Sequence, residues 1–483
     1  MCKFQLLSTW NVQGHGDLHR KGGDRVRRIN PKGRPEHERA VAALRASYDA
    51  VPDGSPVRLA KKTSNLFRPR SAAGPAGLDV SGLDGVVEVD PLGRTADVQG
   101  MCTYEDLVDA TLPHGLMPLV VPQLRTITLG GAVTGLGIEA TSWRHGLPHE
   151  SVIELDILTG AGEIVTARPD NEHAELFAAF PNSLGSLGYA TRLRIELQPI
   201  AAQVALRNIR FDDVEDLLEA VGEVMRTGRW EGEDVDVMDG VMFRPQESYL
   251  VLGRFGGAGP TSDYTGQAIY YQSLRSKATD RLTAYDYLWR WDTDWFWCSA
   301  AFGAQQPVVR RLWPTRLRRS DVYHRIVRLE NRYGFAARVD RWRGNPDRER
   351  VVQDVELPLA LTGKFLHWFA EHVPMAPIWL CPLRLRSGTT WPLYPMHAGE
   401  PYVNVGFWGT VPIVPGAADG DVNRAIEAKV SELGGHKSLY SDAYYDRETF
   451  DRLYGAAAYR AAKDRYDPQH RLTDLYDKVV GRR

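Results

Sequence analysis

Cysteine and long apolar runs are scarce in this 483-residue sequence. The four cysteines are far apart and form no Cys-x-x-Cys pair, which argues against a disulfide framework, a thioredoxin-type motif and a zinc ribbon. No run of 18 apolar residues is present, so we expect no membrane-spanning helix. The short apolar start also lacks the features of a secretory signal. Together these absences predict a cytoplasmic protein without a metal site.

An excess of charge of either sign is also missing. Lysine and arginine number 59, aspartate and glutamate number 61, and the formal net charge is -2. This balance argues against nucleic-acid binding by a broadly basic surface, so any basic patch must be local. Residues 14–35 form one such stretch, rich in Gly, Arg and Lys. We predict that residues 1–37 form a flexible basic extension, with an anion-binding arm as the alternative.

Short β-rich runs, separated by Gly and Asp turns, occupy residues 57–200, and helix-like pieces lie between them. A second region from residue 201 shows strand, helix and strand patterns again. Residues 440–483 have the pattern of a helical tail rich in Tyr, Asp and Arg. The sequence therefore predicts an α+β fold of more than one domain.

Glycine is concentrated between residues 121 and 165, at positions 130, 131, 135, 137 and 146. A residue without Cβ lets backbone amides approach a diphosphate closely. The segment nevertheless contains neither a Gly-x-Gly-x-x-Gly turn with its acidic ribose partner nor a Gly-x4-Gly-Lys-Ser/Thr phosphate loop. The pattern alone leaves two interpretations open: a nucleotide diphosphate site and a glycine-rich turn region.

The order of five segments is more specific than any single motif. These segments are VRLAKKTSNLFRPR, GLDGVVEVDPLGRTADVQGMCTYEDLV, LGGAVTGLGIEATSWRHG, VIELDILTGAGEIV and LFAAFPNSLGSLGYATRLRIEL. In this order, over about residues 55–200, they resemble the FAD-binding domain of the vanillyl-alcohol oxidase (PCMH-type) superfamily. The segments KKTSNLFR, GGAVTGLGIEATS, VVQDVELP, PIWLCP and LYSDAYYDRETF are similar to the Δ24-sterol reductase branch. The likeness is greatest to bacterial flavoproteins that reduce a methylene-branched fatty acyl chain in 10-methyl fatty acid synthesis.

The resemblance implies a fold and a set of cofactor contacts. It places a PCMH-type two-subdomain FAD-binding domain at 38–200, an α+β substrate (cap) domain at 201–430, and a segment returning to the flavin at 431–483. FAD would be bound non-covalently, because the first phosphate loop contains no His. The implied cofactor contacts are Lys61, Lys62, Thr63, Ser64 and Asn65, then Thr128, Gly130, Gly131, Gly135, Gly137, Ser142 and Gly146, and finally Gly185, Gly188 and Tyr189.

Reduction of an isolated alkene requires a proton donor beside the flavin, because such a double bond accepts hydride poorly on its own. The resemblance directs the search for this donor to VVQDVELP, YVNVGFWG and GGHKSLYSDAYY. The stretch from His436 to Tyr440 is favoured, since the C-terminal segment in this superfamily often returns to the flavin ring. For each candidate, a structural hydrogen bond or a solvated charge is the alternative. The candidates are Asp354, Glu356, Tyr402, His436, Lys437, Tyr440 and Tyr444.

Three hypotheses about function remain open at this point. The first is an FAD-dependent reductase of a lipid double bond, with a methylene-branched fatty acyl chain as substrate, NADPH or NADH as electron donor, and a lipid methyltransferase as partner. Δ24-sterol reduction is a variant of it. The second is an FAD-linked oxidase or dehydrogenase of an alcohol, aldose or lactone, which the absence of an HWGK motif weakens. The third is a lipid-binding protein without catalytic activity.

The aromatic residues cluster in the segment 284–319, where a basic run follows them. Trp and Tyr suit membrane interfaces, and a basic residue near anionic head groups contributes about 1 kcal/mol. We predict that this segment makes peripheral contact with the inner face of the membrane. The alternative is a domain-interface core with solvated arginines. The basic run comprises Arg310, Arg311, Arg316, Arg318 and Arg319, around Trp313.

Overall fold

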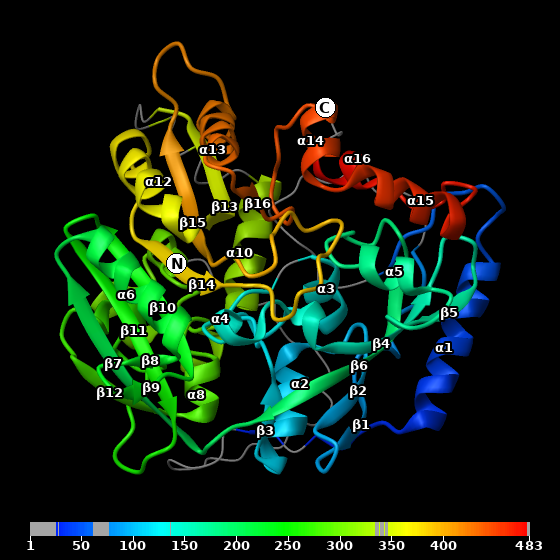
Figure 1. Ribbon diagram of the computed structural model, residues 1–483, viewed down its shortest axis with the longest axis horizontal. Helices are drawn as coiled ribbons and strands as arrows, with labels where there is room; N and C mark the ends of the chain where they lie inside the picture. Colours follow the sequence, from blue (N-terminus) through cyan, green and yellow to red (C-terminus); the bar gives the residue numbers. More distant parts are fainter. Residues whose placement is uncertain are drawn as a thin grey trace, which may run out of the picture.

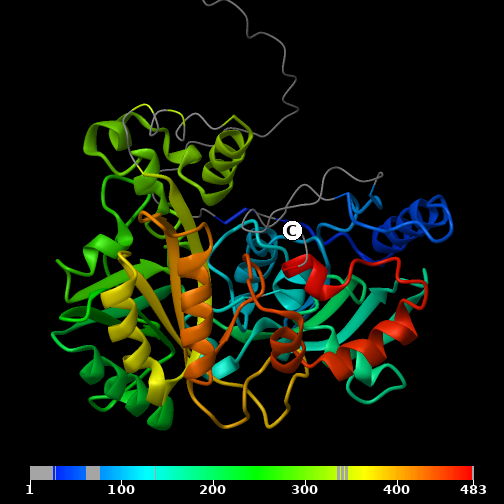
Figure 2. The same ribbon diagram turned by 90° about the horizontal axis from the view of Figure 1, so that it is seen from above.

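Two antiparallel sheets form the centre of the computed structural model, which describes residues 26–60 and 77–480 except 28, 136, 334–337, 339–341 and 343–345. The sheets lie side by side (Figure 1; Figure 2). The chain passes from the first to the second where β6 (Tyr189–Pro199) leads into β7 (Gln203–Phe211). Helices accompany both sheets, so the predicted α+β fold class is confirmed.

The first sheet has the strand order β1-β2-β6-β4-β5, and β3 pairs with β6. Leu155 and Leu193, at its centre, are fully buried. The other strands are β1 (Val86–Asp90), β2 (Thr95–Gln99), β3 (Leu116–Pro118), β4 (Val152–Leu158) and β5 (Ile164–Ala167). The helices of this half are α1 (Arg34–Asp49), α2 (Tyr104–Thr111), α3 (Leu129–Thr134), α4 (Ser142–His145) and α5 (Ala174–Ala179).

The second sheet has eight strands in the order β12-β7-β11-β10-β14-β15-β13-β16. All its neighbouring pairs are antiparallel. Its other strands are β10 (Val237–Arg244), β11 (Glu247–Phe255), β12 (Thr279–Thr283), β13 (Arg348–Pro358), β14 (Ile378–Leu383), β15 (Tyr402–Pro412) and β16 (His436–Lys437). The short strands β8 (Arg229–Trp230) and β9 (Glu233–Asp234) form a separate pair.

One face of the second sheet is covered by α6 (Val214–Thr227), α12 (Leu359–His372) and α13 (Asp421–Glu432). The sequence sets the ends of α6, because Asp213 caps its first turn and Gly228 ends it with a φ of 72°. Side chains alternate along a strand, so Val351, Val355 and Leu357 of β13 face these helices. This face of the sheet is therefore an ordinary apolar core.

The opposite face of the second sheet packs against the first half of the molecule. Val241, Trp379 and Cys381 belong to the same buried cluster as Leu155 and Leu193 of the first sheet. Polar side chains on this face are consequently enclosed between the two halves. A buried polar group is costly unless it has a partner or a function, so this face is where a functional site is expected.

Further helices complete the fold. They are α7 (Tyr270–Ser273), α8 (Ala284–Leu288), α9 (Pro307–Leu312), α10 (Ser320–Tyr333), α14 (Arg447–Leu453), α15 (Ala456–Tyr466) and α16 (Leu475–Val479). Four 3-10 helices occupy Leu112–His114, Pro148–Ser151, Cys298–Phe302 and Thr315–Leu317. Within the part of the chain that the structure describes, no helix is long and apolar enough to span a bilayer.

The described part of the predicted N-terminal extension is attached to the first half. Arg27 Nε donates to Asp109 Oδ2 at 2.7 Å, and Lys32 Nζ donates to Asp84 Oδ1 at 2.5 Å. Helix α1 begins at Arg34, before the predicted domain boundary at residue 38. Ion pairs therefore hold residues that the composition assigned to the extension.

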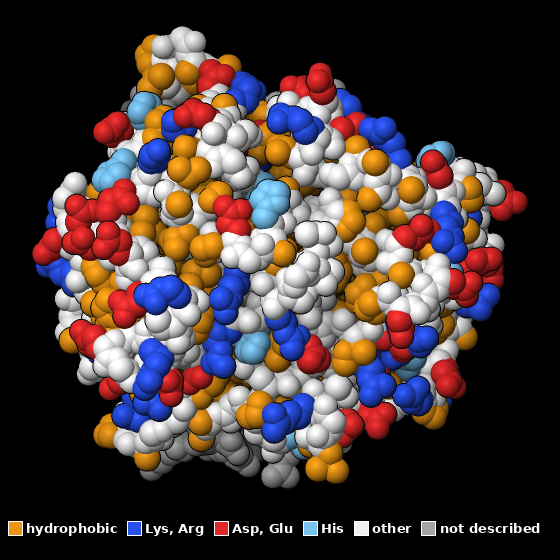
Figure 3. All heavy atoms as spheres, viewed as in Figure 1, with side chains coloured by type: hydrophobic (Ala, Val, Ile, Leu, Met, Phe, Trp, Pro, Cys, Tyr) orange, Lys and Arg blue, Asp and Glu red, His pale blue; other side chains and the backbone are white. Residues whose placement is uncertain are grey.

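The surface mixes charges of both signs. In Figure 3, lysine and arginine side chains are interspersed with aspartate and glutamate over the visible face. The face shows no broad basic area, in keeping with the net charge of -2.

Candidate active site

The second group of predicted cofactor contacts, residues 128–146, forms what we call the second glycine-rich loop. It begins at the N-terminus of α3. Thr128 caps this helix, and its Oγ1 accepts a hydrogen bond from Gly131 N at 3.2 Å. Gly130 N donates to Gly100 O at 3.0 Å, and a Cβ on Gly130 would lie 2.6 Å from that oxygen. Glycine is thus required at 130 because two backbone segments meet there. The amides of Gly130 and Gly131 are used within the protein.

The third group of predicted contacts lies in residues 182–189, the third glycine-rich loop. This loop contacts the second. Leu184 N donates to Thr134 O at 2.7 Å. Positive φ angles recur along this loop, at Asn182 (61°), Leu184 (51°) and Gly185 (73°). Non-glycine residues in this region of φ are strained, and such strain is typical of functional sites.

Several backbone amides in these loops have no acceptor among the described residues of the protein. Within the described residues, the backbone N–H groups of Gly135, Gly137 and Gly185 donate to no other group of the protein. Successive unpaired amides in glycine loops form cavities that bind phosphate oxygens. The two loops therefore fit the diphosphate of a dinucleotide, with Gly135, Gly137 and Gly185 as the residues that would hold it.

Most of the other described residues predicted to bind the cofactor have structural partners. Ser142 Oγ accepts from Glu139 N at 3.1 Å, and Tyr189 Oη donates to Val57 O at 3.4 Å. Gly146 N donates to Ser142 O at 3.0 Å at the end of α4. Gly188, with a φ of 145° before β6, has no backbone acceptor among the described residues. Residues Lys61–Asn65, predicted as the first phosphate loop, lie outside the described residues.

Two candidate acids lie on the enclosed face of the second sheet. Asp354 and Glu356 alternate with Val355 along β13 and so point to the face opposite the helices. Asp354 Oδ1 accepts from Asn404 Nδ2 at 2.9 Å, and its Oδ2 accepts from Tyr440 Oη at 2.6 Å. Burial raises the pKa of Asp354 to about 6, although these hydrogen bonds oppose the rise.

Glu356 lies opposite His436 in the pairing of β13 with β16. Its Oε1 accepts from Ser438 Oγ at 2.5 Å, and its Oε2 lies 3.4 Å from His436 Nε2. Burial raises the pKa of Glu356 well above its ordinary value and lowers that of His436 to about 3. At neutral pH the imidazole is therefore uncharged, and the neutral form of the Glu356 carboxyl group is favoured.

Tyr394 connects these acids to the second glycine-rich loop. Its hydroxyl donates to Gly135 O at 3.3 Å, and its ring lies edge-on to that of His436, with 6.1 Å between centroids. The acids and the loop thus lie on either side of one aromatic side chain. The structure brings Asp354, Glu356, His436 and Tyr440 together near the predicted cofactor loops.

Three other candidate donors are engaged elsewhere. Lys437 Nζ donates to Glu427 Oε1 at 2.9 Å and to Asp442 O. Its neighbour His436 points to the opposite face of β16, since adjacent strand residues alternate. Tyr402 Oη donates to Glu400 at 2.9 Å, although its ring lies edge-on to that of His436, with 6.2 Å between centroids. Tyr444 lies under the guanidinium of Arg424.

Sequence reasoning missed two partners of this cluster. Asn404 and Trp408 extend from β15 beside Asp354, and Trp408 Nε1 donates to Tyr440 Oη at 2.9 Å. A Cβ on Gly406 would lie 2.6 Å from Asp354 Oδ1, so glycine makes room for this carboxyl group. The signal was present in YVNVGFWG, where Asn, Gly and Trp occupy every second position.

A second buried acidic cluster, also missed from the sequence, joins the two halves. Arg290 Nη2 donates to Glu139 Oε1 at 2.5 Å and to Asp239 Oδ2 at 2.9 Å. Trp291 and Trp379 each donate to the same Asp239 oxygen at 3.2 Å. Glu139 follows the glycine loop and Asp239 lies in β10, so this triad fixes the loop against the sheet.

The aromatic segment is buried rather than turned to a membrane. Trp289, Trp291, Trp295, Phe296 and Trp297 are all at most 7% exposed. The alternative of an interface core therefore describes these rings, while membrane contact by other residues of the segment 284–319 stays a prediction. The arginines of the segment differ from that alternative, because not all of them are solvated. Arg310 pairs with Asp294 at 2.6 Å, and Arg318 donates to main-chain carbonyls such as Trp313 O at 2.9 Å.

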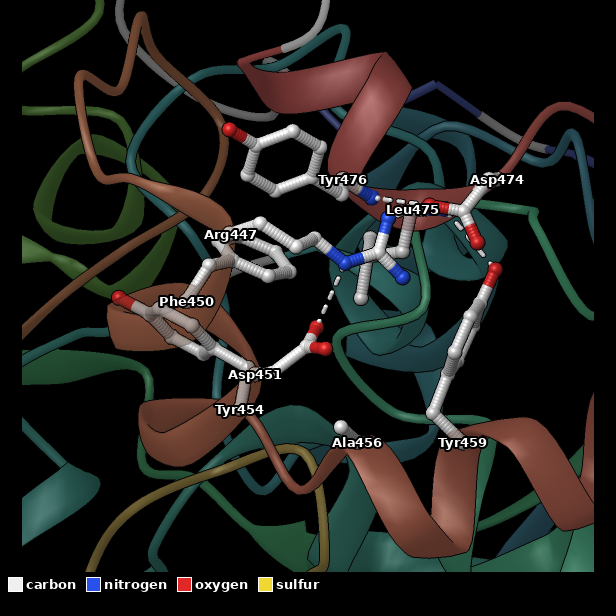
Figure 4. A pocket seen from close by; sticks show the side chains of 9 residues that line it. All are labelled: Arg447, Phe450, Asp451, Tyr454, Ala456, Tyr459, Asp474, Leu475 and Tyr476. Carbon is white, nitrogen blue, oxygen red and sulfur yellow. Dashed lines mark hydrogen bonds and ion pairs between the residues drawn. The ribbon is translucent and has the colours of Figure 1, made fainter.

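A separate pocket lies between α14, α15 and α16 (Figure 4). Its polar side chains already have partners: Arg447 Nε lies 2.9 Å from Asp451 Oδ1, and Tyr459 Oη accepts from Leu475 N at 2.9 Å. The pocket contains no residue of the acidic clusters, although Tyr454 in its lining donates to Lys437 O at 2.8 Å. We interpret this pocket as a packing gap where the three helices meet.

Comparison with known proteins identifies the cofactor. The FAD binding domain family matches residues 34–168, which include the second glycine-rich loop. The protein is therefore an FAD-dependent oxidoreductase, and the predictions of an FAD-binding domain and an enzyme are confirmed.

Its relatives are similar over most of the chain. It is 25% identical to the Δ24-sterol reductase of Homo sapiens over 416 residues, which cover 83% of this chain and 75% of that protein. It is 22% identical to the Δ24-sterol reductase of Pisum sativum over 450 residues, covering 83% and 76%. Cytokinin dehydrogenase 6 of Oryza sativa subsp. japonica is 38% identical over 118 residues, covering 24% of this chain and 22% of that protein.

Proposed function

We propose that this protein reduces a carbon–carbon double bond of a lipid. The substrate in this proposal is a methylene-branched fatty acyl chain, and NADPH is the electron donor. The observation that carries the proposal is the hydrogen-bonded pair of Asp354 and Tyr440 on the enclosed face of the second sheet. The similarity to Δ24-sterol reductases supports a lipid double bond as the reacting group.

Bound FAD, once reduced, supplies hydride to one carbon of the double bond. The other carbon must receive a proton, and Tyr440 is suited to give it. Its hydroxyl donates to Asp354 and accepts from Trp408, which fixes its direction. Burial and the nearby Asp354 raise the pKa of Tyr440 well above its ordinary value, so the hydroxyl stays protonated until the alkene takes the proton.

Asp354 acts in this proposal as a positioning residue that also restores the proton. With a pKa of about 6, its carboxyl group exchanges protons near neutral pH. The phenolate of Tyr440 takes a proton from Asp354, and Asp354 takes one from solvent. One hydride and one proton have then been added to the double bond, and the site returns to its starting charge.

Aromatic side chains beside Tyr440 support an apolar substrate. The rings of Phe296 and Trp297 lie 4.4 and 5.3 Å from that of Trp408, between centroids. Such a wall binds hydrocarbon well and offers few hydrogen bonds to a sugar. It therefore favours a lipid over an aldose or a lactone.

A sterol side chain is the second candidate substrate, because the relatives matched over 83% of this chain are Δ24-sterol reductases. For the methylene-branched acyl chain, a lipid methyltransferase that installs the branch would supply the substrate. The two candidates differ in the shape of the substrate beyond the double bond, and both use the same proton donor.

The test is a reduction assay without oxygen. The purified protein, loaded with FAD and bleached with NADPH, is mixed with a methylene-branched phospholipid or with a Δ24-sterol. In a separate arm, the oxidised FAD-loaded protein is mixed with a polyol. We expect the first lipid to restore the flavin colour and to yield a methyl-branched product by mass spectrometry. Restoration by the sterol alone would favour the second candidate. Reduction of oxidised flavin by the polyol, with neither lipid reacting, would overturn the proposal.

A further inference from the structure

Exposed apolar side chains are concentrated in one stretch of the chain. Of the ten large apolar side chains that are exposed among the described residues, seven lie between 308 and 342. Exposed apolar groups gathered in this way mark an interaction surface. They are Val308 (71% exposed), Val309, Leu312 (77%), Leu317, Leu329, Tyr333 and Trp342 (86%).

Most of these residues belong to α9, α10 and the 3-10 helix between them, a lobe of residues 307–333. This lobe, yellow-green in Figure 2, projects from the rest of the molecule. Inward-facing arginines attach it: Arg310 to Asp294 at 2.6 Å, and Arg319 Nη2 to Glu105 Oε2 at 2.8 Å. The lobe is thus firmly held while its apolar side chains remain in water.

A second group of arginines on this lobe points outward. Arg311, Arg316, Arg325 and Arg328 are exposed. Among the described residues, an ion pair is found for only one of the four, Arg325, with Asp321 at 3.3 Å. The sequence from 307 to 333 contains eight arginines and two acidic residues, whereas the whole chain has a net charge of -2. The lobe is therefore a local positive surface.

We propose that the 307–333 lobe docks on an anionic lipid surface. Its exposed apolar side chains would enter the head-group region, and its outward arginines would contact lipid phosphates. The combination of apolar and basic side chains favours lipid over nucleic acid, because the apolar side chains of Val308 and Leu312 would gain nothing from contact with a phosphodiester backbone. The proposal does not depend on which double bond the enzyme reduces.

The test is co-sedimentation of the full-length FAD-loaded protein with vesicles of phosphatidylglycerol and phosphatidylcholine. Each arginine near an anionic surface raises binding about five-fold, the factor equivalent to about 1 kcal/mol. We expect the variant with Arg311, Arg316, Arg325 and Arg328 changed to Glu to bind more than about 100-fold more weakly. A matched variant, with the exposed Arg39, Arg45, Arg226 and Arg254 changed to Glu, should bind more nearly like the wild type.

The apolar contribution has its own pair of variants. Val308→Asp with Leu312→Asp should weaken binding, whereas Leu92→Asp with Val414→Asp, which are exposed elsewhere, should not. Unchanged flavin absorbance, melting temperature and activity on detergent-dispersed substrate would show that the fold and catalysis are intact. Failure of wild-type protein to bind anionic vesicles at low salt, or equal binding by the arginine variant and the wild type, would overturn the proposal. So would a dimer in solution that Leu312→Asp dissociates, if vesicle binding is absent.

Discussion

The enclosed face of the second sheet carries two buried acidic clusters that differ in one respect. The triad of Glu139, Arg290 and Asp239 contains a cation, and the cluster of Asp354, Glu356, His436 and Tyr440 contains none. Burial raises the pKa of Glu139, but the guanidinium of Arg290 opposes that rise. In the second cluster no cation opposes the effect of burial, which raises the pKa of both Asp354 and Glu356 and favours their neutral forms. The first cluster stabilises the structure and the second can supply a proton.

The largest effect is expected from removing the cation of the triad. Arg290→Met leaves two carboxyl groups buried without their partner, and such losses cost about 3–5 kcal/mol of stability. Denaturant unfolding of the variant and the wild type would measure this loss of stability. The control is Arg144→Met, which breaks the ion pair of Arg144, 39% exposed, with Asp236 and should cost less than about 1 kcal/mol. Equal losses in the two variants would contradict the comparison.

The next largest effect is expected on turnover, when the hydroxyl of the proposed proton donor is removed. Tyr440→Phe removes the hydroxyl but keeps the ring, so we expect turnover to fall about 100-fold, equivalent to about 2.7 kcal/mol, while the flavin stays bound. Steady-state kinetics with the methylene-branched lipid would measure this. Tyr444→Phe is the matched control, because Tyr444 lies away from Asp354 under Arg424. A loss of turnover in both variants would argue against a specific role for Tyr440.

The pH dependence of stability offers a smaller effect with a definite sign. The pKa of Asp354 is about 6 in the folded protein, above its ordinary 3.8, so the protonated form is favoured by folding. Its contribution is most favourable below pH 3.8 and is lost as the pH rises toward and past 6. Relative to wild type, Asp354→Asn should therefore gain about 2 kcal/mol between pH 4.5 and 7.5. A constant difference across this range would exclude the raised pKa.

The smallest effect is expected at Glu356. Burial raises the pKa of this carboxyl group well above its ordinary value and so favours its neutral form. Because Glu356→Gln puts a neutral amide in its place, we expect the free energy of unfolding to change by less than about 1 kcal/mol. Asp239→Asn is the contrasting variant, since it removes one of the two carboxylates that hold Arg290. Chemical denaturation of both would show whether only the triad depends on charge.

The sequence predicted one cluster in part and the other not at all. Asp354, Glu356, His436 and Tyr440 could be singled out because their motifs match a family. The register that places Glu356 opposite His436 depends on strand pairing across 80 residues, which the sequence does not show. The contact of Arg290 with Glu139 spans 151 residues and involves no motif. Lys437 could have been separated from His436 by the alternation of strand side chains alone.

The α+β class was predictable because short alternating runs and Gly turns recur along the chain. Whether the tryptophans are buried or exposed was not predictable, because the same rings suit a membrane surface and an interface core. Burial separates the two: Trp291 is 1% exposed, whereas Leu312 in the neighbouring lobe is 77% exposed. Composition located the aromatic and basic segment, and only the structure showed which of its residues face water.

The most direct test of the central claim, that the cation-free cluster supplies the proton, is a single-turnover experiment without oxygen. NADPH-reduced wild type and Tyr440→Phe are each mixed with methylene-branched phospholipid, and flavin reoxidation and the methyl-branched product are followed together. The account predicts rapid reoxidation with stoichiometric product in the wild type, and a rate about 100-fold lower in the variant. Equal rates in the two proteins, each with full product, would contradict it.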